Sequence, residues 1–152
     1  MTLQQRLRVY VHNQRRGREI LGAGEVAARN QKLAGQVAVL NQDNSQNFGT
    51  NPARRGSVIE IFATGAGETD PPLLPGEPAP ASGNPLILTR AQPTVTIGGV
   101  QARVLFSGMA PGFVGLWQIN AEVPASVPPG SAVSLTITSG GITSNTVTIA
   151  VE

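Results

Sequence analysis

The chain contains no cysteine among its 152 residues, which excludes disulfide bonds, thiolate nucleophiles and cysteine-ligated zinc. Histidine occurs once, as His12, and only 13% of the residues are charged, so there is little material for acid–base chemistry near neutral pH. The basic N-terminal residues are not followed by an apolar stretch of about 7–15 residues, and no run approaches the roughly 20 apolar residues that cross a bilayer. We therefore expect no signal peptide, no membrane insertion, no cofactor and no catalysis.

What the chain does have is β-type alternation between turns rich in its 18 glycines and 12 prolines. Trp117, Ile119, Ala121 and Val123 are apolar, and the residues between them are mostly polar. Successive side chains of a strand point to opposite faces, so this pattern indicates one buried face and one wet face. Similar patterns predict strands at residues 36–40, 57–63, 86–88, 94–97, 100–106, 116–123, 132–138 and 145–151.

About seven strands with turns every 8–12 residues are typical of an immunoglobulin-like β-sandwich. We predict such an all-β sandwich over residues 35–152, preceded by an irregular extension over residues 1–34. Gly98–Gly99 predicts a two-residue hairpin turn within it. Residues 64–83, rich in proline and glycine, predict a long surface loop, and loops of this length are usually functional or mobile.

The high isoelectric point belongs to the N-terminal extension. Residues 1–32 hold seven basic and two acidic residues, a net charge of +5, whereas residues 33–152 hold four basic and seven acidic residues, a net charge of −3. Leu7, Val9 and Val11 alternate with polar residues there and predict a short edge strand. With few aromatics and no recognisable nucleic-acid-binding pattern, we interpret the segment as a solvated basic tail and expect no nucleic-acid partner.

Four segments in order carry a family resemblance: GSVIEIFATGAG from residue 56, VTIGGVQARVLFSG from 95, WQINAEVP from 117 and PPGSAVSLTITSGGITSNTVTIAV from 128. Together they resemble an uncharacterised C-terminal β-domain abundant in acidobacteria, of the Solibacter type, over about residues 35–152. The layout is also similar to the wider IPT/TIG immunoglobulin-like modules. The resemblance implies a place beside other modules of a longer exported protein, outside the cell or on its surface, and it supplies no catalytic residues.

Asn41, Asp43, Ser45 and Asn47 alternate in an oxygen-rich turn, a composition that suits calcium. The turn has a single carboxylate, however, and does not follow the EF-hand spacing. Asparagine, aspartate and serine in such a stretch more often bond the backbone amides of the turn itself. We therefore expect a structural turn and no metal.

Glu68, Asp70 and Glu77 in the long loop are the carboxylates on which a small enzyme-appended domain would depend. A serine–histidine–acid triad would instead need His12, which lies in the extension, to dock onto the sandwich. We interpret the three carboxylates as solubilising the loop.

Ligand-binding residues are expected in the loops and on the wet face of the sandwich. Trp117 is in phase with the apolar positions of its strand, so we assign it to the core. Met109 and Phe113, in the loop before that strand, are candidates for an exposed apolar contact. Gln118 and Asn120 point to the other face and can offer hydrogen bonds to a ligand.

These features favour a non-catalytic accessory or adhesion module of a secreted or cell-surface bacterial protein, binding protein or glycan through its loops. One alternative is a self-assembling subunit, a homo-oligomer in which Leu7, Val9 and Val11 add a strand to a neighbour's sheet edge. Another is a small enzyme-appended domain.

Overall fold

The computed structural model describes residues 8–9 and 39–152, and the regular secondary structure of these residues is entirely β. The described part of the chain has no helix of the length and apolarity that crossing a membrane requires. The strands are β1 (Arg8–Val9), β2 (Val39–Leu40), β3 (Val58–Thr64), β4 (Thr69–Asp70), β5 (Leu88–Thr89), β6 (Thr94–Ile97), β7 (Val100–Met109), β8 (Trp117–Glu122), β9 (Gly130–Ser139), β10 (Ile142–Thr143) and β11 (Val147–Val151).

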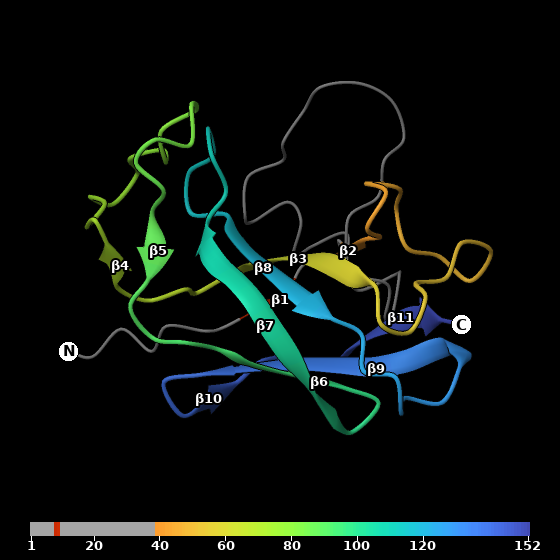
Figure 1. Cartoon of the computed structure of the whole chain (residues 1–152). Coiled ribbons are helices and arrows are strands. Elements are labelled where there is room, and N and C mark those ends of the chain that lie inside the picture. Colours follow the sequence, from red (N-terminus) through yellow and green to blue (C-terminus); the bar gives the residue numbers. More distant parts are fainter. Residues whose placement is uncertain (1–7, 10–38) are drawn as a thin grey trace, which may run out of the picture.

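The strands form two layers that share one long strand, β7 (Figure 1). In the first layer, sheet A, β8 lies between β3 and β7, and β5 and β4 continue the sheet beyond β7. In the second layer, sheet B, β6 lies between β7 and β9, and β10 and β11 pair with the other edge of β9. The first residues of β7 pair with β6 and the rest pair with β8, so the antiparallel sheet curls on itself into a half-barrel.

The core lies between the two layers, and the predicted alternation locates it correctly. In β8, Trp117, Ile119 and Ala121 are fully buried, while the residues between them are only partly buried. Each fully buried large apolar side chain stabilises the fold by about 1.5–3 kcal/mol. The largest of them are Trp117, Ile59, Ile61, Ile97, Ile119, Leu135 and Ile137.

A buried hydrogen-bond network satisfies the polar atom of the core tryptophan. Trp117 Nε1 donates to Ser107 Oγ at 2.9 Å, and Ser107 Oγ lies 2.6 Å from Thr89 Oγ1. All three side chains are buried, so each would be costly without a partner. The network thereby joins β8, β7 and β5 inside the core.

The segment between β2 and β3 closes an edge of each sheet. β2 pairs with β3 in sheet A, and Ala53 then forms a parallel bridge with Val151 in β11 of sheet B. Asn47 extends this edge with its side chain, since its Nδ2 donates to the Ala150 carbonyl at 2.9 Å and its Oδ1 accepts from the Ala150 N–H at 2.7 Å. Edge strands invite pairing with other chains, so this segment protects β11.

Several strand boundaries differ from the predictions. The predicted loop over 64–83 contains β4, and β10 lies between the predicted strands 132–138 and 145–151. β7 continues to Met109 instead of ending at residue 106. The hairpin at Gly98–Gly99 is confirmed, with φ of 56° and 80°, a left-handed backbone that suits glycine. The predicted domain boundary at residues 34/35 lies outside the described residues.

Candidate functional site

The outer face of sheet A, turned away from the core, groups two aromatic rings with two amides. Directly opposed residues of an antiparallel pair share a face. Phe62 in β3 lies opposite Gln118 in β8. Two residues further along β8, Asn120 lies between Glu60 in β3 and Phe106 in β7, and is directly opposite both. All five side chains are partly exposed. We call these five residues the outer-face cluster.

The two amides of the cluster are oriented by each other. Gln118 Nε2 donates to Asn120 Oδ1 at 3.1 Å, and both residues are half-buried. Among the described residues, Gln118 Oε1 and Asn120 Nδ2 have no protein partner. The pair therefore leaves one acceptor and one donor on the outer face, the face to which the sequence pattern assigns both residues.

A glycine makes room for the second aromatic ring. Gly108 lies opposite Gln118 and two residues after Phe106, hence on the same face of β7. A Cβ added at Gly108 would stand 2.8 Å from Phe106 Cζ, so the ring extends along the strand over the glycine. Leu88 in β5 lies opposite Gly108 and continues the apolar surface with 43% exposure.

Phe106 lies on this face because of a β-bulge that the sequence pattern did not reveal. The register of β7 against β8 shifts between Val104 and Phe106, which leaves Leu105 as the extra, exposed residue. Plain alternation with Val100, Ala102 and Val104 predicts that Phe106 faces the core, and the bulge makes this prediction wrong. The alternation of β3 alone is enough to locate Phe62 on the outer face, because Phe62 is two residues from Glu60 and both are partly exposed.

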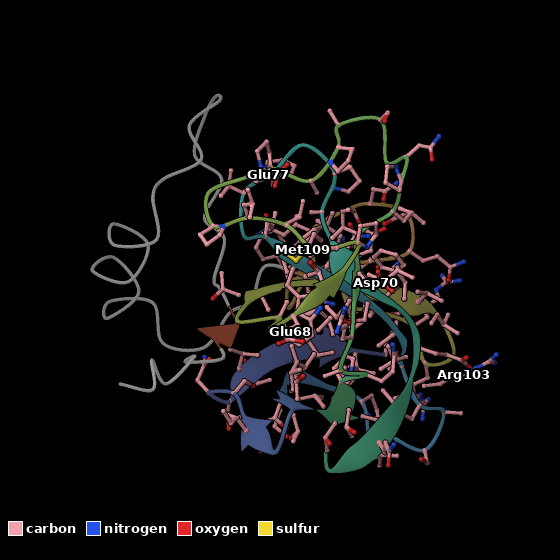
Figure 2. All side chains as sticks on the ribbon, turned by 90° about the vertical axis from the view of Figure 1, so that its left-hand side faces the viewer. Glu68, Asp70, Glu77, Arg103 and Met109 are labelled. Atoms are coloured by element: carbon pink, nitrogen blue, oxygen red, sulfur yellow. The ribbon has the colours of Figure 1, made fainter. Side chains whose placement is uncertain are left out.

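Met109, predicted to be an exposed loop residue, is buried in β7, so this prediction is wrong. The bulge changes the phase of the strand, so that Ser107 and Met109 point into the core opposite Ile119 and Trp117. Figure 2 shows Met109 within the body of the molecule, below Glu77. The thioether therefore packs against the core and is not available to a ligand.

Phe113 is exposed, as predicted, at the end of the sandwich where two loops meet. Its carbonyl accepts a hydrogen bond from Ala79 N–H at 3.1 Å, and Gly112 N–H donates to the Ala79 carbonyl at 2.9 Å. These bonds fasten the long loop to the β7–β8 loop. Phe113, Val114 and Leu74, at 36%, 57% and 75% exposure, make this loop end a second apolar surface.

The predicted edge strand in the extension is present in part. Arg8–Val9 forms β1, which pairs antiparallel with β3 through Arg8 opposite Thr64 and Val9 opposite Ala63. Leu7 and Val11, the other two residues predicted for this strand, lie outside the described residues, as does His12.

The oxygen-rich turn is held by its own hydrogen bonds, as predicted. Asn41 and Asn47 are buried and joined by a bond from Asn47 Nδ2 to Asn41 Oδ1 at 3.0 Å. The Asp43 carboxylate accepts from the Ser45 N–H at 3.0 Å and from the Ser45 hydroxyl. Within the described residues no group of histidine, aspartate and glutamate side chains is arranged to hold a metal ion.

The hydrogen bond from the Ser45 hydroxyl, followed by that from its N–H, holds the pKa of Asp43 below the ordinary value of 3.8. A lowered pKa means that Asp43 stabilises the fold above its unfolded-state pKa, and that this contribution is lost as pH falls through the lower, folded-state value. We expect a carboxyl NMR titration of Asp43 to have its midpoint below 3.8, and Ser45→Ala to raise it. A midpoint unchanged by Ser45→Ala would contradict this cause.

The three loop carboxylates do not converge on one site. Glu77 Oε2 accepts the Leu74 N–H at 3.0 Å, and Figure 2 shows Glu77 apart from Glu68 and Asp70. Glu68 pairs with Arg90 at 3.6 Å beside a shallow groove of about 290 Å³, which lies between the β3–β4 turn and the β9–β10 hairpin. Both side chains are largely exposed, so the pair contributes little.

None of the family models, curated proteins or solved structures compared with the chain matches it.

Proposed function

We propose that the chain is an immunoglobulin-like module that binds carbohydrate, without catalysis, on the outer face of sheet A. The strand order supports the immunoglobulin-like assignment. A constant-type domain has strands A, B, E and D in one sheet and C, F and G in the other. Here β2, β3, β8 and β7 follow the order A-B-E-D, and β6, β9 and β11 follow the order C-F-G.

The parallel bridge between Ala53 and Val151 also supports this assignment. It takes the first part of the chain from the edge of sheet A to the edge of sheet B, beside the last strand. The resemblance to the acidobacterial domain and to IPT/TIG modules favours the same fold. It also favours a place in a longer, secreted or cell-surface bacterial protein.

The grouping of two rings and two amides on one sheet face is the observation that most directly supports a carbohydrate ligand. A pyranose ring has an apolar C–H face, which packs on an aromatic ring, and a rim of hydroxyls, which bond to amides. Phe62 and Phe106 flank the amides of Gln118 and Asn120 on one rigid sheet. The carboxylate of Glu60, beside Asn120, adds oxygen atoms that can accept hydrogen bonds from the hydroxyls of the sugar.

Substitution on the outer face tests this function. We expect Phe62→Ala to weaken binding about 10- to 100-fold, because a phenyl ring buried by a ligand contributes about 1.5–3 kcal/mol. Gln118→Ala should weaken it as well, since the free acceptor is lost. A glycan array of glucose, xylose, mannose and galactose oligomers would identify the ligand, and calorimetry would then measure each variant.

Phe113→Ala is the matched control, since Phe113 is an exposed phenylalanine at the loop end and not in the outer-face cluster. Thermal melting of each variant would show that it is folded. Retained binding in Phe113→Ala with loss in Phe62→Ala supports the outer face, whereas the reverse would move the site to the loop end. Absence of binding to every glycan at millimolar concentration would contradict a carbohydrate ligand.

A further inference from the structure

The edge of β3 that faces away from β8 pairs with two strands. β2 pairs with it at Glu60 and Ile61, and β1 pairs with it at Ala63 and Thr64. β1 has two described residues, and its only strand partner in the described structure is β3. β1 lies at the end of the strand order, so its pairing with β3 can open while β3, β8 and β7 stay paired.

β1 is joined to the sandwich by a long connection. The 29 residues 10–38 separate β1 from β2. A chain of this length spans at most about 100 Å, against a radius of gyration of roughly 13 Å for a domain of about 115 residues. The β1 segment of one molecule therefore has the reach to occupy β3 of a neighbouring molecule.

Charge favours the same encounter. Residues 1–32 carry a net charge of +5, and residues 33–152 carry −3. The extension of one copy is thus attracted to the sandwich of another, and such attraction accelerates association at low ionic strength.

We propose that β1 is exchanged between two copies of this chain, so that Arg8–Val9 of one molecule pairs with Ala63–Thr64 of the other. The exchanged strand makes the same antiparallel bonds as in the single chain, so exchange costs no pairing energy. Reciprocal exchange closes a two-fold symmetric dimer. The ratio of exchanged dimer to single chain depends on the protein concentration. Pairing within one chain has an effective concentration that falls as the segment linking β1 to the sandwich lengthens, and pairing between chains competes with it. Dense display or high concentration therefore favours the exchanged form.

Disulfide trapping tests the exchange, and the absence of cysteine from the chain removes background cross-links. Cross-strand neighbours have Cβ atoms about 4.5–5.5 Å apart, close enough for a disulfide after small adjustments. We would mix a tagged Arg8→Cys chain with an untagged Thr64→Cys chain and oxidise them mildly. The expected product is a mixed dimer joined through residues 8 and 64, identified by mass spectrometry and increasing with protein concentration.

Thr143→Cys replaces Thr64→Cys in the control mixture, because Thr143 is an exposed strand residue of sheet B. A yield no higher than that of the control overturns the proposal. So does an Arg8→Cys/Thr64→Cys double variant that closes only within single chains at every concentration. Circular dichroism of each variant establishes that it is folded, and neither result depends on whether the outer face binds carbohydrate.

Discussion

Replacing Gly108 with alanine is expected to lower the free energy of unfolding by about 3 kcal/mol or more. A Cβ at this position would stand 2.5 Å from the Ile87 carbonyl oxygen and 2.8 Å from Phe106 Cζ. The ring can turn away, but the carbonyl is backbone and accepts the Met109 N–H at 2.8 Å. Relief of the clash therefore has to separate β5 from β7.

The same substitution should weaken carbohydrate binding, because the Phe106 ring would lose its place over the glycine. Gly49→Ala is the matched control, since the nearest atom to a Cβ there is 3.8 Å away and its φ is not positive. Thermal and urea unfolding would measure both variants. A Gly108→Ala protein as stable as Gly49→Ala would show that β5 gives way at no cost and would contradict the expectation.

The core follows closely from the sequence, because period-2 alternation is a local property. Trp117, Ile119 and Ala121 lie in one unbroken phase, and all three are buried as predicted. A strand that keeps its register needs only its own residues to show which face is inward. The amides of Gln118 and Asn120 were located on the outer face by the same reasoning.

The pattern fails where the phase of a strand changes. The bulge at Leu105 moves Phe106 to the outer face and Met109 into the core, and nothing in the residues 100–109 marks the extra residue. Simple alternation therefore predicts one ring of the outer-face cluster in the core, and it ends the strand before Met109, which is buried. The bulge is determined by pairing with β8, a partner that local periodicity does not show.

Asn47→Ala is expected to cost about 2–4 kcal/mol, because its side chain is bonded to a strand 103 residues away in the sequence. The residue is buried, with 6% exposure, and its loss would leave the N–H and the carbonyl of Ala150 without their side-chain partner. The N–H bond is the more costly of the two to lose, because the carbonyl still accepts from the Ala53 N–H at 2.9 Å. Asn41 would also lose the donor to its Oδ1.

Chemical unfolding of Asn47→Ala beside Gln101→Ala, an exposed amide of β7, would measure this cost. Asn47→Asp separates hydrogen bonding from packing. It keeps the acceptor for the Ala150 N–H but sets a carboxylate oxygen against the Ala150 carbonyl and Asn41 Oδ1, so it should be no more stable than Asn47→Ala near neutral pH. If Asn47→Asp matched the parent protein, the amide would not be the group that holds the segment on β11. The protection of that edge would then rest on the backbone bonds of Ala53 and Arg55.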